Sequence, residues 1–294
     1  MSMEKTFIVS VILLLSSIVL AVPTTLQDPN VLQQKKTSII ADNNLPTQRV
    51  INLGDDVNMV LVLIQPGEFD MGSPESEPKR SDDEFLHHVK ITKPFYMGKF
   101  EVTQAQYKKI IEKKFFIGCE FKGNSRPVEN ADWHQVIYTI RALTAKTGLH
   151  FRLPTEAEWE YACRAGTATP FYTGKSLGSE TANFKCKKQD EYCESSSDVY
   201  VDQTVPVGGY SENAFGLCDM HGNVWEWCSD LYDKDYYKTA PMVDPKGPQI
   251  GDGRVIRGGA WNKHADKCRS ASRNHRSENA NKPNIGFRVV MDAE

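Results

Sequence analysis

The sequence predicts an α+β domain with little regular secondary structure, and three observations support this expectation. Residues 59–64 are an unbroken apolar run ended by Pro66 and Gly67, which is typical of a buried strand. Three separate segments begin like helices, whereas no long helical pattern follows residue 166. Irregular backbone leaves many N–H and C=O groups in need of partners. We therefore expect side-chain networks, disulfides or bound ions to hold this domain together.

Residues 88–102 alternate apolar and polar side chains, which predicts a further pair of strands. The three helix starts share one signature, a capping residue followed three positions later by Gln or Glu: Thr103 and Gln106, Asp132 and Gln135, Thr155 and Glu158. In such a capping box each side chain satisfies a free backbone N–H of the first turn. The second helix is expected to end at Gly148 and the third at Gly166.

Composition places the chain among ordinary globular proteins. It has 294 residues, of which 40% are hydrophobic and 25% charged, with a formal net charge of −3 and both signs interspersed. A nucleic-acid-binding protein would normally show a basic face, so nucleic acid is not an expected partner. There is no P-loop, no G-x-S-x-G elbow and no G-x-G-x-x-G motif.

The N-terminus predicts export. Residues 1–21 combine an early Lys5, an apolar run from Phe7 to Leu20 and a small residue at Ala21, which is the pattern of a secretory signal peptide. The alternative is a membrane anchor, but the run is shorter than the roughly 20 apolar residues that span a bilayer. Residues 22–54 are polar and predict a linker or loosely ordered extension, followed by the main domain at 55–294. The mature protein is expected to be secreted or periplasmic, without a stable membrane anchor.

Export changes the interpretation of the cysteines, because thiols tend to pair in oxidising compartments. The chain has seven, so at least one remains unpaired or bonds to a partner. Cys186 and Cys193 are close in sequence and are a candidate local disulfide. Cys228 and Cys268 are a second candidate pair. Spacing alone leaves the connectivity open.

Several segments together resemble the formylglycine-generating enzyme family, also called sulfatase-modifying factors. They occur in the family's order over roughly residues 57–291: MVLVLIQPGEFDMGS, PFYMGKFEVTQAQY, FRLPTEAEWEYACRAG, GLCDMHGNVWEW, RVIRGGAWN, RSASR and NIGFRVV. The resemblance implies an irregular single domain related to C-type lectins. Active members of the family oxidise a substrate cysteine to formylglycine.

The resemblance also implies structural calcium. At the motif beginning at Asp219, Asp219 and Glu226 would give carboxylate oxygens, and Gly222 and Val224 backbone carbonyls. Such hard oxygen ligands suit calcium. The alternative is a salt-bridged turn without an ion. A second site is implied at Asn183 and Phe184, with Asp198 and Tyr200 as the nearest further candidates.

The chain departs from the family at the copper site. Family enzymes hold copper(I) between two cysteines that follow the Gly-Gly-aromatic motif, which matches residues 258–261 here. Soft thiolates suit this ion. Here residues 262–267 contain no cysteine, and by register Cys268 belongs with the following core segment. Copper is therefore an unexpected cofactor, and His264 with Cys268 is a poor substitute pair. The seven histidines lack the cluster that the related iron-dependent sulfoxide synthases need.

No catalytic residue is predicted. Glu156, Glu158 and Glu160 are expected to serve the start of their helix rather than catalysis. A set of C-terminal arginines is expected to pair with carboxylates in the irregular core: Arg254, Arg257, Arg269, Arg273, Arg276 and Arg288.

The predicted function is that of an exported, calcium-stabilised family member that is not a copper-dependent formylglycine oxidase. One alternative is a non-catalytic, lectin-like module that binds a ligand or protein through its polar C-terminal surface. Another is a divergent periplasmic oxidoreductase, because a branch that resembles this chain acts in siderophore maturation. A structural scaffold in an envelope assembly is a third. If the chain is an enzyme, its substrate is expected to be a protein or peptide; the oligomeric state stays open.

Overall fold

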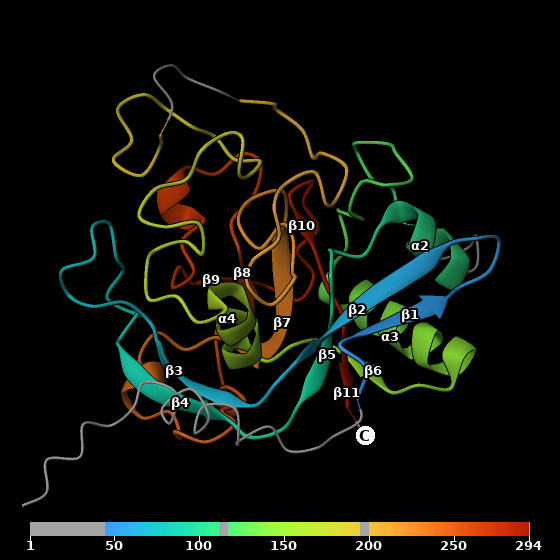
Figure 1. Ribbon diagram of the computed structural model, residues 1–294, viewed down its shortest axis with the longest axis horizontal. Coiled ribbons are helices and arrows are strands. Elements are labelled where there is room, and N and C mark those ends of the chain that lie inside the picture. The colour runs from blue at the N-terminus through green and yellow to red at the C-terminus, as the bar shows by residue number, and fades with distance from the viewer. Residues whose placement is uncertain (1–44, 112–116, 195–199, 294) are drawn as a thin grey trace, which may run out of the picture. The chain divides into compact units, whose positions relative to one another are not determined.

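A computed structural model describes residues 45–111, 117–194 and 200–293 of the chain (Figure 1). Regular elements are short and separated by long loops, which confirms the predicted α+β fold with little regular secondary structure. The helices are α2 (Gln104–Ile110), α3 (Trp133–Thr147) and α4 (Glu156–Arg164), with short 3-10 turns η2 (Tyr236–Lys238) and η3 (Ala265–Lys267). The strands are β1 (Gln48–Asn52), β2 (Asn58–Ile64), β3 (Gly67–Met71), β4 (His87–Ile91), β5 (Phe95–Gly98), β6 (Phe151–Arg152), β7 (Trp225–Leu231), β8 (Arg254–Arg257), β9 (Asn274–Arg276), β10 (Ile285–Gly286) and β11 (Val290–Asp292).

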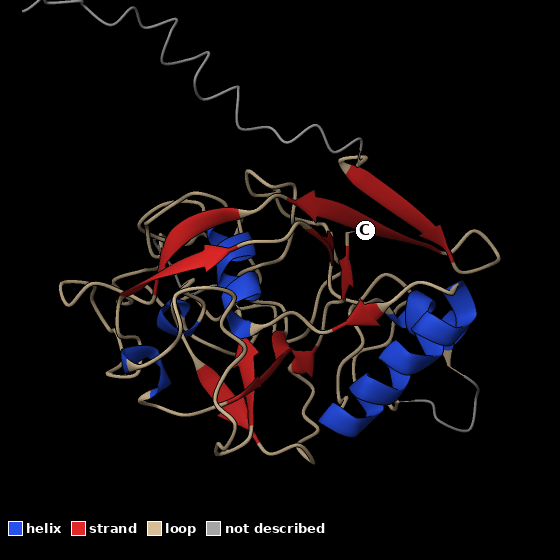
Figure 2. Ribbon diagram, turned by 90° about the horizontal axis from the view of Figure 1, so that it is seen from below, coloured by secondary structure: helices blue, strands red, loops and turns tan. Residues whose placement is uncertain are grey.

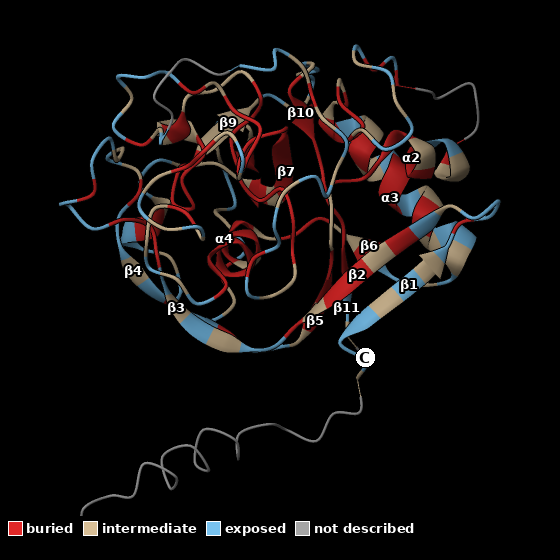
Figure 3. Cartoon of the chain, turned by 45° about the horizontal axis from the view of Figure 1, so that its top comes forward, coloured by how far each residue is buried: buried red, intermediate tan, exposed pale blue. Residues whose placement is uncertain are grey.

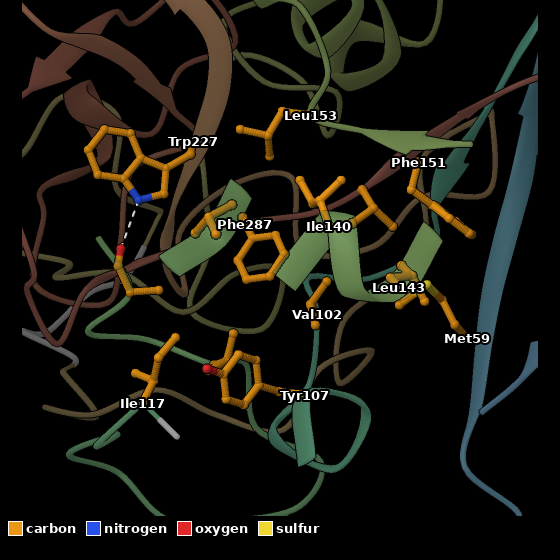
Figure 4. Close-up of a cluster of buried hydrophobic side chains, with 14 of the residues drawn as sticks. Met59, Val102, Tyr107, Ile117, Ile140, Leu143, Phe151, Leu153, Trp227 and Phe287 are labelled. Atoms are coloured by element: carbon orange, nitrogen blue, oxygen red, sulfur yellow. Dashed lines mark hydrogen bonds between the residues drawn. The ribbon is translucent and has the colours of Figure 1, made fainter. Parts of the chain in front are cut away.

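The largest sheet has the strand order β1-β2-β5-β11-β6, so the C-terminal strand lies inside it. All its pairs are antiparallel. Helices α2 and α3 lie beside this sheet (Figures 1 and 2). Between them is a hydrophobic core that includes Met59, Ile140 and Leu143 (Figure 4). In the same cluster Trp227 donates from its indole Nε1 to the Ala131 carbonyl at 2.9 Å, which satisfies its only polar group.

The second sheet has the order β10-β7-β8-β9, in which β10 runs parallel to β7. A separate hairpin pairs β3 with β4. Helix α4 contacts β3, β4, β7 and β8, and most of its residues are buried (Figure 3). A helix enclosed on nearly all sides needs partners for its polar side chains as well as for its apolar ones.

All three predicted helix starts are confirmed. Thr103, Asp132 and Thr155 each accept a hydrogen bond from the backbone N–H three residues on, and each box is closed by the returning Gln or Glu. Helix α3 ends at Gly148 in the left-handed region, as expected (φ 73°). Helix α4 ends at Arg164, two residues before Gly166, because Ala165 already adopts a left-handed conformation (φ 45°).

Buried arginine–glutamate pairs join the loops of the domain to one another. Each arginine in these pairs is fully or almost fully buried, and the pairs are Arg164 and Arg257 with Glu160, Arg273 with Glu156, Arg269 with Glu77 and Glu84, and Arg288 with Glu226. The predicted pairing of C-terminal arginines is thus confirmed for most of the set. Arg254 pairs with the partly exposed Glu278, whereas Arg276 donates to Asn274 instead of a carboxylate. Glu156 and Glu160 were expected to interact with the dipole of helix α4, and in the structure they also form these buried pairs with arginine.

The ordered domain begins before residue 55, which corrects the expected linker boundary. Strand β1 pairs along its whole length with β2, from Gln48 opposite Val62 to Asn52 opposite Asn58. Val50 and its neighbours alternate exposed and half-buried side chains, a pattern that suits an edge strand with one face toward the domain. The predicted signal peptide and the rest of the extension lie outside the described residues. Among the described residues, no helix has the length and apolar character needed to span a bilayer.

The structure forms one of the two candidate disulfides, Cys186–Cys193. The second candidate pair is not formed, since Cys228 and Cys268 are both free thiols. Cys228 lies on β7 and packs in the cluster around Trp159, whereas Cys268 packs in a separate cluster around Phe171. The expected pairing was wrong because the sequence does not show in which hydrophobic cluster each cysteine packs.

Candidate functional site

The two segments with predicted calcium ligands lie side by side. The Asn223 N–H donates to the Asn183 carbonyl at 2.8 Å, and Asn183 forms a bridge with Gly222. Gly222 adopts a left-handed conformation (φ 82°), and a Cβ there would come within 2.2 Å of the Asn183 carbonyl oxygen. Only glycine therefore allows this close approach. The sequence did not indicate that the two predicted calcium sites are direct neighbours in the fold.

Three carboxylates and one guanidinium are buried around the turn. Glu226 accepts from Arg288 at 2.6 and 2.7 Å, while Asp219 accepts from the Gly208 N–H at 2.6 Å. The third carboxylate belongs to Glu101, between β5 and α2, and accepts from the Asn223 amide at 2.8 Å. All of these side chains are buried. Sequence reasoning missed Glu101, although it stands inside the motif PFYMGKFEVTQAQY.

Burial and mutual repulsion raise the pKa values of two of these acids. Burial raises the pKa of Asp219 to about 6, and the charge of Glu226 adds to this effect. Burial raises the pKa of Glu101 well above its usual range, and Asp219 and Glu226 raise it further. Arg288 opposes both shifts but is one cation facing three acids. The turn is therefore short of positive charge.

Two buried oxygen atoms at these segments have no hydrogen-bond donor, and both belong to predicted ligands. They are Asp219 Oδ1 and Asn183 Oδ1. Buried polar atoms in native proteins are nearly always satisfied. Asn183 directs its amide nitrogen to the Gln203 carbonyl and to Asn223, which leaves its oxygen as the unsatisfied atom. Donor-free oxygens beside excess negative charge fit a hard cation.

Glu226 fits the predicted site less simply. Its two oxygens already accept from Arg288 and from the Trp159 indole at 2.7 Å. Within the described ranges, no three His, Cys, Asp or Glu side chains are grouped as a metal site. An ion here would need backbone carbonyls, as predicted for Gly222 and Val224, and would share Glu226 with Arg288.

The remaining second-site candidates are less defined. Phe184 is buried next to Asn183, whereas Asp198 lies outside the described residues. Tyr200 stacks on Trp261 with 6.0 Å between ring centroids, and Lys185 lies over the same tyrosine ring at 5.0 Å. Phe121 meets Trp261 edge-on at 5.3 Å. These side chains form an aromatic cluster at the Gly-Gly-aromatic motif.

His221 connects the turn to the region of the family's copper loop. Its Nδ1 lies 2.7 Å from the Cys268 carbonyl and therefore carries the proton, while Nε2 accepts from the Tyr172 N–H at 3.0 Å. Burial lowers the pKa of His221 to about 3, so the ring is neutral. The ring also stacks on Tyr172. His221 thus has a structural role in the described fold.

Cys268 does not face an open site. Its sulfur packs under Gly259, where an added Cβ would lie 2.3 Å from Sγ. Burial raises the pKa of the Cys268 thiol to about 12. His264 lies 3.2 Å from the Lys185 carbonyl through Nδ1, and its side chain is 38% exposed. The Cys268 thiol donates to the His264 backbone carbonyl at 3.6 Å, so its sulfur is directed to the His264 backbone.

The sulfatase-modifying factor enzyme 1-like domain matches residues 55–293. The chain is 39% identical over 149 residues to the formylglycine-generating enzyme of Streptomyces coelicolor, which covers 49% of this chain and 47% of that protein. It is 28% identical over 280 residues to the bovine (Bos taurus) formylglycine-generating enzyme, covering 79% and 74%. The chain thus spans about half the length of the Streptomyces relative and about three quarters of the bovine one.

Two solved structures have the same fold. PvdO from Pseudomonas aeruginosa superimposes with a TM-score of 0.71 at 28% identity, covering 85% of this chain and all of that one. Treponema denticola variable protein 1 has a TM-score of 0.72 at 23% identity with the same coverage, which supports the fold alone. The chain is a formylglycine-generating-enzyme-like protein with a C-type-lectin-like fold. It belongs to the sulfatase-modifying factor enzyme 1-like family.

Proposed function

We propose that this protein is an exported, calcium-stabilised member of the family that acts by binding a protein or peptide rather than by copper-dependent oxidation. The observation that carries the proposal is the state of the thiols. All seven cysteines are among the described residues, two form a disulfide, and the other five are buried: Cys119, Cys163, Cys218, Cys228 and Cys268. Burial raises the pKa of every one of these five thiols. A copper(I) site needs two accessible thiolates on facing positions.

Charge balance supports the calcium part of the proposal. One guanidinium faces three buried carboxylates, so full ionisation leaves two uncompensated negative charges around Asp219. A single calcium ion would cancel both. Asp219 Oδ1 and Asn183 Oδ1 offer free lone pairs for ions at the two neighbouring segments. Calcium accepts mixed carboxylate, amide and carbonyl oxygens in such irregular shells.

Export is supported by the N-terminal pattern and by the Cys186–Cys193 disulfide, because such bonds persist in oxidising compartments. The surface around the Gly-Gly-aromatic motif favours binding. Its aromatic cluster combines the exposed Tyr200 with the partly buried Phe121 and the buried Trp261, and Lys185 lies over the Tyr200 ring. Aromatic rings beside a cation are common features of recognition surfaces.

The test is direct. The purified chain is incubated with copper(I) and a peptide containing the family's C-x-P-x-R target, and the peptide is analysed by mass spectrometry. We expect this chain not to convert the peptide thiol to an aldehyde. The Streptomyces coelicolor enzyme is the positive control and should convert it under the same conditions. Conversion by this chain above the copper-only background would overturn the proposal and favour the divergent oxidoreductase.

A further inference from the structure

A cavity of about 580 Å³ lies at one end of the five-stranded sheet. Its wall includes Phe95 at the start of β5, Arg152 at the end of β6 and Asp292 at the end of β11. Phe95 pairs directly with Asp292, and Arg152 pairs with Val290, so the three positions are brought together by strand register. None of the predicted calcium or copper-loop residues lines this cavity. The volume lies within the range of small-molecule sites.

Hydrogen bonds and ion pairs between its own residues hold the wall of this cavity in place. Arg152 holds Glu158 through two bonds of 2.6 and 2.7 Å and holds Asp292 at 2.9 Å. On the other side, Asp244 accepts from the Thr92 N–H at 2.8 Å and from its hydroxyl. Backbone bonds of Lys90 to Met242 and Asp244 attach the same loop to β4. Preorganised walls lower the cost of binding.

Three cations and three carboxylates line this cavity, but they are not paired evenly. Each of its carboxylates, Glu158, Asp292 and Asp244, is already engaged by Arg152 or Thr92. Lys93 and Lys246 also line the cavity, and their ammonium groups have no hydrogen bond or ion pair with another described residue. Both are exposed, and in the chain each lies within two residues of the Thr92–Asp244 contact. Within the described part of the chain, the cavity therefore offers two ammonium groups that no carboxylate engages.

The remaining lining is largely apolar and comes from Ile91, Pro94, Phe95, Leu153, Pro245 and Ala293. An inorganic anion would use the lysines but make no use of this apolar lining. We propose that the cavity binds a small amphipathic anion, with an apolar body against these side chains and one or two carboxylates at Lys93 and Lys246. Apolar contact and charge-assisted hydrogen bonds would then act together.

Calorimetric titration of the full chain with three probes tests the proposal. The probes are isophthalate, benzoate and benzamide, which share one ring and carry two, one and no carboxylates. We expect affinity to fall in that order. Lys93→Gln and Lys246→Gln should each weaken isophthalate by about fivefold to tenfold. Lys175→Gln is the matched control, because Lys175 is exposed and lies outside the cavity, and it should leave the affinity unchanged.

Lysine acetylation followed by peptide mapping locates the binding. Isophthalate should protect Lys93 and Lys246 from acetic anhydride but leave Lys175 as reactive as in the free protein. Equal affinity for benzamide and isophthalate, absence of binding at about 10 mM probe, or full retention of affinity in both cavity variants would each overturn the proposal. The copper assay above is independent of these outcomes, since none of the cavity residues belongs to the copper loop.

Discussion

Arg288 and Glu226 form a buried ion pair, with 2.6 Å between Nη2 and Oε1 and 2.7 Å between Nε and Oε2. The same guanidinium donates to the backbone carbonyls of Gly98 and Cys218, so it joins the main sheet to the predicted calcium turn. Arg288 lowers the pKa values of Asp219 and Glu101, and among the described residues no other arginine is hydrogen-bonded to either carboxylate. The stability of the turn should therefore depend on an added cation.

Calcium should raise the thermal stability of the wild-type protein, and Asp219→Ala should remove most of that effect. At a concentration 100 times its Kd, a ligand that binds only the folded state adds about 2.7 kcal/mol. For a domain of this size this corresponds to an increase of roughly 5 to 10 °C in Tm. Differential scanning calorimetry with calcium and with chelator measures the change.

Asp82→Ala is the matched control for this prediction. Asp82 is exposed and lies outside the predicted calcium segments, so its variant should keep the full response to calcium. Magnesium should replace calcium poorly, because it demands a regular octahedral shell that an irregular loop does not offer. Identical melting curves in calcium and in chelator for the wild type would disprove the calcium proposal.

A separate buried acid predicts a pH dependence of stability. Burial raises the pKa of Asp230 to about 7, and the neighbouring Glu156 charge contributes. The folded state then keeps a proton that the unfolded chain loses near its usual pKa of 3.8. The contribution to stability is thus fully present below about pH 4 and is lost as the pH rises toward 7.

Asp230→Asn should reduce this loss, because the amide cannot ionise but can still accept from the Glu156 N–H and the Ser229 hydroxyl. The variant should gain on the order of 4 kcal/mol relative to wild type between pH 4 and pH 8. Urea unfolding at a series of pH values in chelator measures it. Asp82→Asn, at an exposed position, is the control and should follow the wild-type profile. Parallel profiles for Asp230→Asn and wild type would contradict the prediction.

Local chemistry allowed the helix starts to be predicted, because a capping box is complete within four residues. Thr103, Asp132 and Thr155 therefore needed no tertiary information. Strand β1 was missed because its alternation is short and polar, and its pairing with β2 stabilises it. Glu101 was missed as a site residue for a related reason: nothing near it in sequence shows that it meets Asn223, more than a hundred residues away.

Disulfide pairing shows the same limit. Cys186 and Cys193 are near in sequence, so local spacing was sufficient, whereas the expected Cys228–Cys268 bond depended on tertiary placement and is absent. Alkylation of the denatured, unreduced protein should modify five thiols, and reduction should increase this to seven. If only three thiols were modified before reduction, four cysteines would be paired and the second disulfide would be present after all.

Double replacement of Cys186 and Cys193 by serine should destabilise the fold. A cross-link that closes a loop of this length restricts the unfolded chain by about 2 kcal/mol. The change should appear in urea unfolding as a lower midpoint, with the same slope. Cys119→Ser at a free thiol is the comparison, and it should leave the number of disulfides unchanged by mass spectrometry. A midpoint equal to wild type in the double variant would contradict the prediction.

Arg269→Met should be among the most destabilising changes in the chain. Arg269 is fully buried and donates to Glu77 at 2.6 Å and to Glu84 at 2.7 and 2.8 Å, which ties residues 77–84 to the core. Its removal leaves two buried carboxylates without a cation, and breaking a buried pair in this way costs about 3 to 5 kcal/mol.

Replacing the whole group should cost much less. The triple variant Arg269→Met, Glu77→Gln, Glu84→Gln leaves no buried charge, so it should recover a large part of the lost free energy of unfolding, as measured in urea. Lys238→Met, which breaks an exposed pair with Asp235, is the control and should leave the midpoint unchanged. If the triple variant were as unstable as Arg269→Met, the cost would come from lost packing and hydrogen bonds around Arg269 rather than from unpaired charge.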